Sequence, residues 1–265
     1  MLSKKNDPLV WLPLLIALLL LGAIYLFHLN RILFYAINSS SATFGGFWAH
    51  VTVFGDGLVV AVLLLPWLRK RPDILWAMLW TTLVFNIILH SMKSGFNLPR
   101  PPFVLPHDSF FIIGPAHNHH SFPSGHTATG FAFAGALAFG LKDKKMQTAL
   151  FLAAVLVGLS RIGVGVHWPA DVLAGLIVGW GSALIGWIIA DRISIGRGLM
   201  FQMIIGPLLL AAAMVLVVDY DTKYPQTDWL RYVVGGMMLI WGGYEFVRIF
   251  IDRQKEKSRL RTLPG

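Results

Sequence analysis

The apolar residues of this chain come in long blocks, and this pattern restricts it to a helical membrane protein. Each block has the length of about 17–25 residues that crosses a bilayer as a helix. Eight such spans are expected, at approximately 9–27, 47–68, 73–92, 124–141, 146–162, 169–190, 199–218 and 229–250. Backbone groups in lipid must be paired within their own segment, and no alternating pattern typical of barrel strands is present. We therefore expect an all-α, polytopic protein.

The composition agrees with this class of protein. Hydrophobic residues make up 56% of the chain and charged residues only 13%, about half the charged share of an ordinary soluble domain. The first apolar block is long for a signal peptide, and no clear cleavage site follows it, so we interpret it as a retained span. The second block is interrupted by Gly55, Asp56 and Gly57 and is the least regular.

The basic residues predict an orientation. If the chain begins inside, most of the 22 Lys and Arg residues fall in inner loops or in the C-terminal tail. This bias favours eight spans with both termini in the cytoplasm. It also accounts for the formal charge of +9 without a nucleic-acid partner. Lys93, Arg100 and Arg161 break the pattern at outer helix ends, and all nine histidines lie on or near the same side. A functional site is therefore expected at the outer surface.

Three strings in this outer region carry chemical information. The first is Lys93, six residues, Arg100 and Pro101; the second is Pro123-Ser124-Gly125-His126; the third is Ser160-Arg161, five residues, His167, three residues and Asp171. Fixed cations and N–H donors are what a phosphoryl group in transfer requires. A helix that begins at the second string would add free amides and a positive dipole end.

In these strings and their order, the chain resembles the type 2 phosphatidic acid phosphatase (PAP2) superfamily, which also includes the vanadium haloperoxidases. The resemblance implies a helical core of six spans, which here corresponds to residues 1–198. Residues 199–250 would then be an additional pair of transmembrane helices, and residues 251–265 a basic cytoplasmic tail. The haloperoxidase branch is generally soluble, which does not fit this chain.

The resemblance also implies roles for single residues. His167 would be the nucleophile that forms a phosphohistidine, Asp171 would orient it, and His126 would protonate the leaving oxygen and later activate water. The phosphate would be bound by Lys93, Arg100, Ser124, Gly125 and Arg161. The spacing of His167 and Asp171 permits contact across one helical turn. Neither a metal nor another cofactor is expected.

The function implied is a phosphatase for membrane lipid phosphates or diphosphates, with its site facing outward from a bacterial-type plasma membrane. Undecaprenyl diphosphate is the first candidate substrate, followed by phosphatidate, phosphatidylglycerophosphate and the lipid A 1-phosphate. Two alternatives stay open: a lipid phosphotransferase that uses the same site, and a non-enzymatic lipid transporter. The expected partners are the substrate and membrane lipids, and the sequence gives no oligomeric state.

Other polar residues are less informative. Asn86 and His90 could line the pocket from one face of the third span. Asp56 and Glu245 lie within spans, where ionisable groups are functional candidates. The histidine-rich run 117–120 is interpreted as a solvated loop rather than a metal site. The acidic loop with Asp219, Asp221 and Asp228 has no role that the sequence explains.

Overall fold

The computed structural model describes residues 7–261, and it describes their side chains to residue 255 with the exception of residue 9. Over this range the chain is helical and contains no strand. The long helices are α1 (Pro8–Leu26), α3 (Ser41–Val53), α5 (Pro72–Phe96), α7 (Gly125–Gly140), α8 (Lys144–Gly163), α9 (Pro169–Arg192), α10 (Leu199–Val218) and α11 (Asp228–Arg261). Shorter ones are α2 (Asn30–Asn38), α4 (Gly57–Val62) and α6 (Pro101–Val104), with 3-10 turns at Leu65–Trp67, His107–Ser109, Ile195–Arg197 and Pro225–Thr227.

Every expected span contains a helix, and the differences lie at the ends and in the second span. That span is broken at Gly55 and Asp56, where α3 and the following short helices meet at 55°. Asp56 caps α4, since its carboxylate accepts hydrogen bonds from the amides of Leu58 and Val59. Helix α2 was not expected, and it turns away from α1 by 108°.

The lengths of the helices give fewer spans than the sequence predicts. Among the described residues, five helices are long and apolar enough to cross a membrane, or up to seven if each bent pair counts as one span. Helix α7 has only 16 residues, which is about 24 Å at 1.5 Å per residue and short of a typical hydrocarbon core. The count of eight therefore stays a prediction.

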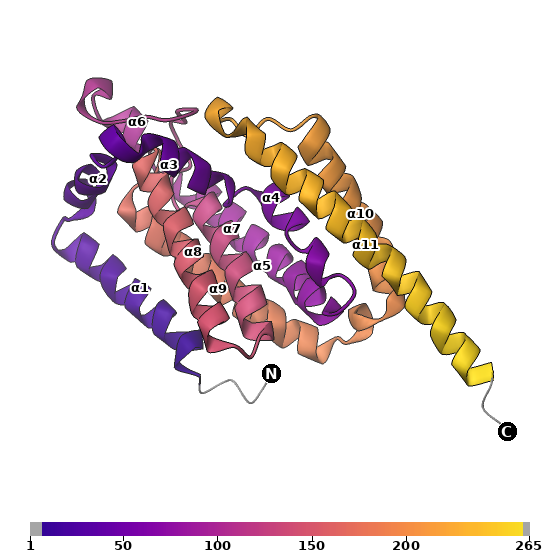
Figure 1. Cartoon of the computed structure of the whole chain (residues 1–265). Coiled ribbons are helices and arrows are strands. Elements are labelled where there is room, and N and C mark those ends of the chain that lie inside the picture. Colours follow the sequence, from indigo (N-terminus) through magenta and orange to yellow (C-terminus); the bar gives the residue numbers. More distant parts are fainter. Residues whose placement is uncertain (1–6, 262–265) are drawn as a thin grey trace.

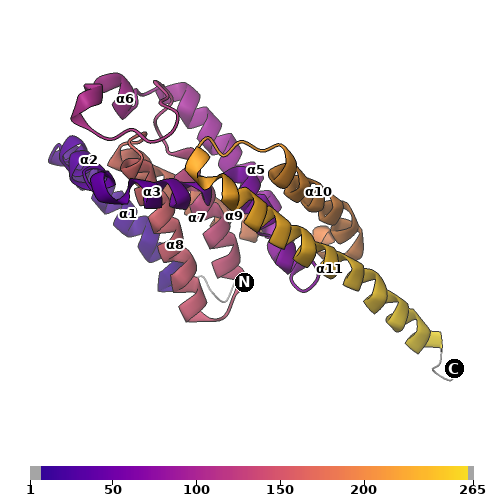
Figure 2. The same ribbon diagram turned by 45° about the horizontal axis from the view of Figure 1, so that its top comes forward.

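The centre of the bundle is built on small residues. Helix α9 packs against α7, α5 and α1, and Figures 1 and 2 show it enclosed by its neighbours. A Cβ atom on Gly175 would lie 2.8 Å from the Ser124 carbonyl oxygen, and one on Gly179 would lie 2.2 Å from that of Ala128. Glycines at this four-residue spacing let two helix backbones approach closely. The contact sets the position of the first turn of α7 relative to α9.

The C-terminal pair α10 and α11 packs on α4 and on the turn that follows it. At the far end of this pair, Glu245 is 3% exposed and receives a hydrogen bond from Arg69 Nε at 2.6 Å. Glu245 is therefore part of a structural ion pair. Helix α11 runs on to Arg261, where a solvated tail had been expected from residue 251. The basic side chains from residue 256 onward lie outside the described residues, as do Lys4 and Lys5.

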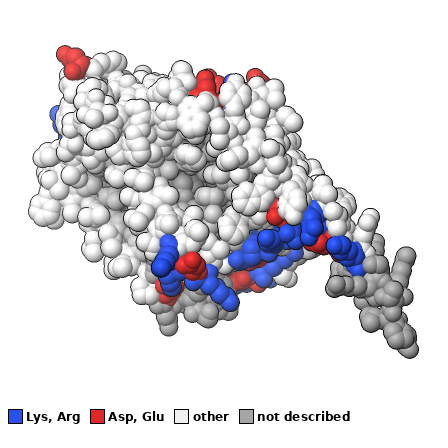
Figure 3. Space-filling view, viewed as in Figure 1, with Lys and Arg blue, Asp and Glu red and all other residues white. Residues whose placement is uncertain are grey.

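The two ends of the bundle differ in charge. In Figure 1 the connector between α5 and α7 (residues 97–124), which carries α6, lies at the top, whereas the start of α1 and the end of α11 both lie at the lower side. On the face drawn in Figure 3, Lys and Arg gather along the lower edge and only a few acidic groups are visible at the top. This distribution agrees with the expected basic inner loops.

Candidate active site

Four helix ends and one connector bring the expected site residues to the upper end of the bundle. Lys93 lies in the last turn of α5, and Arg100 immediately precedes α6. Ser124 is the N-cap of α7, which begins at Gly125 and His126, while Arg161 lies in the last turn of α8. His167 lies in the loop before α9, and Asp171 in the first turn of that helix. The expected span ended at residue 92, whereas α5 extends to Phe96, so Lys93 lies within the helix and not just beyond its end.

His167 and Asp171 form a buried pair. His167 Nδ1 lies 3.2 Å from Asp171 Oδ2, and each residue is only 2% exposed. The same carboxylate oxygen accepts hydrogen bonds from the Trp168 amide at 2.8 Å and from the Ser121 hydroxyl at 2.5 Å. Three donors therefore fix this carboxylate. A bond from Nδ1–H to Asp171 leaves the lone pair of Nε2 on the other side of the ring.

The electrostatic surroundings favour a neutral His167. Burial is the largest cause that lowers the pKa of His167 well below its usual value of 6.5, and the positive charges of Arg100, Arg161 and Lys93 lower it further. A histidine must be unprotonated at one nitrogen to act as a nucleophile. The lowered pKa favours this state.

The connector holds two of the cations through its backbone. Lys93 Nζ donates to the His120 carbonyl oxygen at 2.7 Å, and His120 Nδ1 lies 3.1 Å from the Lys93 carbonyl oxygen. Arg100 Nε donates to the carbonyl oxygen of His119 at 3.0 Å, and Nη2 to that of His120 at 3.4 Å. The histidine-rich run thus contributes carbonyl oxygens. Among the described residues no group of histidines and carboxylates could hold a metal ion.

Arg161 is the most deeply buried of the three cations. Its exposed fraction is 5%. Nη1 donates to Thr52 Oγ1 and, at 3.0 Å, to the hydroxyl of Tyr224. Nε is buried and has no hydrogen-bond partner within the described part of the chain. In the same part of the chain the Nε atoms of Arg197, Arg231 and Arg248 are buried without a partner as well, so it is the position of Arg161 near Arg100 and His167, and not this nitrogen alone, that suits a bound anion.

The three cations share a further property. In the part of the chain that the structure describes, no carboxylate forms an ion pair with Lys93, Arg100 or Arg161. Neutral carbonyls and hydroxyls hold them instead. Burying several like charges without counter-ions is unfavourable, so the arrangement is suited to an anion.

The start of α7 differs in detail from what the sequence suggested. The Ser124 amide donates to the Asp171 carbonyl oxygen at 3.0 Å, and its hydroxyl receives a bond from Thr127 at 2.9 Å. Ser124 is 0% exposed. The amides of Gly125 and His126 come next and precede the first repeating helix bond, which is made by Ala128. A Cβ on Gly125 would meet no protein atom closer than 3.8 Å, so protein packing does not require a glycine there.

His126 lies among the same cations, within electrostatic reach of Arg161, Arg100 and Lys93. It is half-buried. Gly55 packs on it, because a Cβ at that position would lie 2.9 Å from both the Cβ and the carbonyl oxygen of His126. The second-span break therefore lies directly beside this histidine.

Several residues of the site were not found from the sequence. Ser121 and Tyr224 lie outside the three strings and carry no distinctive spacing. Asn38, in the unexpected helix α2, is 1% exposed and donates to the carbonyl oxygens of Phe111, Ile162 and Gly163. It fastens the connector to the end of α8. The one available sequence signal for Asn38 was a polar residue directly after the apolar run 32–37.

The other polar candidates make contacts of a structural kind. His90 is exposed on α5, and Asn86 donates to the Thr82 carbonyl oxygen within the same helix. Asp56 acts as a helix cap and accepts a hydrogen bond from Tyr220 at 2.5 Å.

The fold and these residues define a helical bundle with a cluster of cations and a buried histidine–carboxylate pair between helix ends. A sequence model described as the PAP2 superfamily matches residues 74–195, which include all eight expected site residues. The chain is 32% identical over 180 residues to an undecaprenyl-diphosphatase of Sulfolobus acidocaldarius, covering 66% of this chain and 86% of that protein. The chain belongs to the PAP2 superfamily.

Two further proteins are similar to this chain over a smaller part of its length. A lipid A 1-phosphatase of Rhizobium etli is 35% identical over 132 residues, which is 48% of this chain and 53% of that protein. The chain thus spans about half the length of this relative. The crystal structure of Aquifex aeolicus LpxE superposes with a TM-score of 0.56 at 32% identity, and covers 60% of this chain and 94% of that one.

Proposed function

We propose that this protein is a metal-independent phosphatase of membrane lipid phosphates or diphosphates. The observation that carries the proposal is the set of three cations without carboxylate partners around the buried pair of His167 and Asp171. Such a set stabilises the charge of a phosphoryl group in transfer. Membership of the PAP2 superfamily and the lipid phosphatases among the relatives support it.

The proposed reaction has two steps. His167 Nε2 attacks phosphorus and forms the N–P bond while the bond to the leaving oxygen breaks, and His126 donates a proton to that oxygen. Asp171 accepts a hydrogen bond from Nδ1–H, which stays on the ring, and its negative charge stabilises the imidazolium-like charge that develops on His167. Water then attacks the phosphohistidine, gives its proton to His126, and releases inorganic phosphate and free His167. Lys93, Arg100 and Arg161, with the first amides of α7, bind the phosphoryl oxygens; the role of Ser124 is to support that turn.

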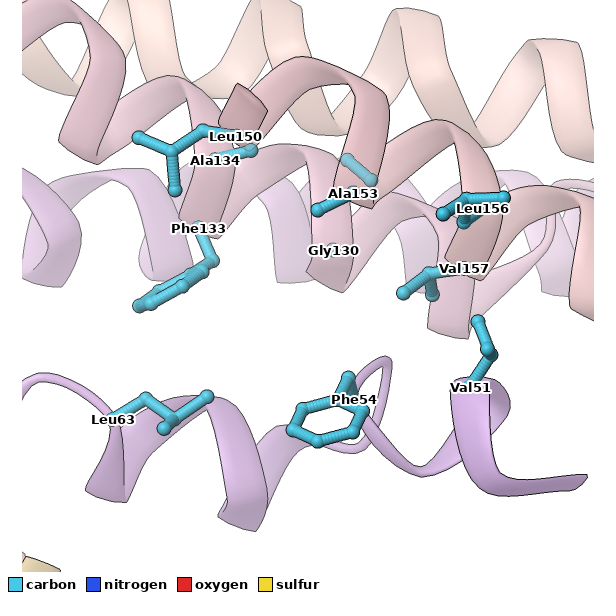
Figure 4. Close-up of a pocket in the computed structure, with 11 residues that line it drawn as sticks. Val51, Phe54, Leu63, Gly130, Phe133, Ala134, Leu150, Ala153, Leu156 and Val157 are labelled. Carbon is cyan, nitrogen blue, oxygen red and sulfur yellow. The ribbon is translucent and has the colours of Figure 1, made fainter. Parts of the chain in front are cut away.

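An apolar groove next to the site suits a lipid tail. Figure 4 shows Val51 on α3, together with Phe54 and Leu63 directly after α3 and α4, facing α7 and α8 across it. Gly130, which lines the groove, is one turn beyond His126 on α7. We propose that the acyl or isoprenoid chain lies here while the phosphate binds above it. The positive-inside pattern supports a site that faces outward.

The substrate is proposed from the relatives. Undecaprenyl diphosphate is the first candidate, since the relative of that activity matches over most of its own length. Lipid A 1-phosphate is the second, in line with the Rhizobium relative. Phosphatidate and phosphatidylglycerophosphate complete the set that needs testing.

The central experiment measures inorganic phosphate released by the purified protein from these four lipids, with and without chelator. We expect release from at least one lipid, unchanged by the chelator and independent of any added acceptor. Activity that requires an added lipid acceptor would establish a phosphotransferase instead. Lipid translocation without phosphate release would establish a transporter.

The groove has its own test. Ala153 on α8 lines it, and Ala153→Trp would fill part of the space. We expect KM to rise about tenfold for the long-chain lipid and to stay unchanged for a water-soluble phosphate ester. Equal effects on both substrates would show that the tail binds elsewhere.

A further inference from the structure

Tyr224 links the C-terminal helix pair to the site. It lies in the loop between α10 and α11, outside the matched residues 74–195. Its side chain is buried, with 4% exposed, and its hydroxyl accepts the hydrogen bond of Arg161 Nη1 at 3.0 Å. The loop therefore reaches from an added pair of helices to a cation of the proposed phosphate site.

The surroundings hold Tyr224 in place. Its ring lies against Gly114 of the connector, where a Cβ would come within 2.5 Å of the ring. Its carbonyl oxygen accepts hydrogen bonds from the Thr222 hydroxyl at 3.2 Å and from both the amide and the hydroxyl of Thr227 at 2.8 Å. Both threonines are buried. These contacts fix the backbone and the ring of Tyr224, so its hydroxyl is a fixed acceptor for Arg161.

The consequence for Arg161 follows from the shape of the guanidinium. The group is planar and rigid, so fixing Nη1 between Tyr224 and Thr52 sets the directions of the other nitrogens. Nε, which is buried and without a partner among the described residues, is then aimed rather than free to rotate. Thr52 also lies outside residues 74–195, so both acceptors come from parts of the chain beyond the family match.

The same loop has a second connection to the site. The Tyr220 hydroxyl donates to Asp56 at 2.5 Å, and Asp56 follows Gly55, which packs on His126. The loop thus touches the supports of Arg161 and of His126. These contacts explain structurally why the loop between α10 and α11 is present, which its acidic residues alone did not.

We propose that Tyr224 is a positioning residue for Arg161, so that the α10–α11 pair is part of the phosphate-binding unit. The proposal rests on the proposed function for its catalytic consequence, but its binding consequence can be measured separately. Tyr224→Phe keeps the ring that packs on Gly114 and removes only the acceptor oxygen. Tyr232→Phe is a matched control, because the hydroxyl of Tyr232 also accepts from an arginine, Arg231, at 2.6 Å on the exposed side of α11.

The experiment measures orthovanadate affinity by calorimetry, the midpoint of thermal unfolding, and kcat and KM where phosphate release is found. For Y224F we expect affinity and kcat/KM to fall about tenfold, the scale of one lost hydrogen bond to a charged group, with the unfolding midpoint close to the parent value. Y232F should match the parent protein in every measurement. In an Arg161→Lys background, Y224F should cause no further loss of affinity, because its effect acts through the guanidinium.

Three results would overturn the proposal. The first is a vanadate affinity of Y224F equal to that of Y232F. The second is a loss of affinity on adding Y224F to the Arg161→Lys variant that equals the loss in the parent protein. The third is a Y224F protein that unfolds, which would assign the hydroxyl to stability. If the parent protein binds vanadate but releases phosphate from no lipid, the proposed function fails while the positioning of Arg161 is still decided by affinity.

Discussion

The Ser124 amide donates a hydrogen bond to the Asp171 carbonyl oxygen at 3.0 Å, and this bond joins the first turns of α7 and α9. His126 follows Ser124 by two residues, and the Asp171 side chain holds His167. This backbone contact therefore helps to set the proposed acid and the proposed nucleophile relative to one another. This contact depends on the close approach of the two helices.

Ser121→Ala is expected to lower activity without unfolding the protein. The Ser121 hydroxyl, 0% exposed, donates to the same oxygen of Asp171 that faces His167. Its loss leaves that oxygen freer to move, and we expect kcat to fall about tenfold with little change in KM, since a positioning bond matters most in the transition state.

Ser109→Ala is the control for this variant, because Ser109 lies in the same connector but is exposed and bonds only to Tyr35 and Pro106. Steady-state kinetics of both variants provide the check. A Ser121 variant with the parent kcat would mean that the Trp168 amide alone is sufficient to hold Asp171.

The pH dependence of kcat/KM should reflect the lowered pKa of His167. Burial keeps this pKa well below 6.5, so the neutral nucleophile persists at pH values where an exposed histidine is already protonated. Activity that requires neutral His167 is then retained from pH 7.5 down through 6.5 and is lost only at lower pH. Because kcat/KM reports the free enzyme, its profile between pH 5 and 8 is the measurement. An acid limb centred above pH 6.5 would contradict the buried, cation-surrounded setting.

The sequence predicts the order of the helices and the residues of the site because both leave strong local patterns. Apolar blocks predict spans regardless of how the helices pack. The three short strings predict a cluster of cations and histidines, and the requirements of phosphoryl transfer make such a cluster plausible. Their assembly at one end follows from the even alternation of helix directions. The expected span stopped at residue 92, one residue before Lys93, because helix α5 continues for four residues beyond its apolar part.

The residues that sequence reasoning missed act through tertiary contacts. Ser121 and Tyr224 are ordinary polar residues in loops until the fold brings them to Asp171 and Arg161. Helix α2 has a polar face and too few residues to register as a span. The effect of residues 199–250 on the site could not be inferred, because no local pattern records that a loop folds back over the bundle.

Asn38→Ala should destabilise the protein by about 2–3 kcal/mol, the cost of leaving buried carbonyl groups without their donor. Its amide nitrogen lies 2.9 Å from the Phe111 oxygen and 2.9 Å from that of Gly163, and its oxygen receives the Phe111 amide at 2.8 Å. Asn86→Ala removes only a bond to the preceding turn of its own helix and should cost less than about 0.5 kcal/mol. Thermal unfolding in detergent compares the two. Equal midpoints would show that the connector is not held to α8 by Asn38.

Gly179→Ala and Gly181→Ala form a pair that tests the helix contact beneath the site. A Cβ on Gly179 would lie 2.2 Å from the Ala128 carbonyl oxygen and 2.9 Å from the Ala132 amide nitrogen, and backbone atoms cannot move aside as a flexible side chain can. A Cβ on Gly181, two residues further along α9, meets nothing within 4 Å.

We therefore expect Gly181→Ala to leave activity unchanged and to stabilise α9 by up to about 1 kcal/mol, the difference in helix propensity between the two residues. Gly179→Ala should cost about 2 kcal/mol through overpacking. It should also reduce kcat/KM by about a hundredfold, because a shift of α7 by 1 Å displaces His126 from the His167 side of the site. If Gly179→Ala lowers the unfolding midpoint but leaves kcat/KM at the parent value, the geometry of the site does not depend on the α7–α9 contact.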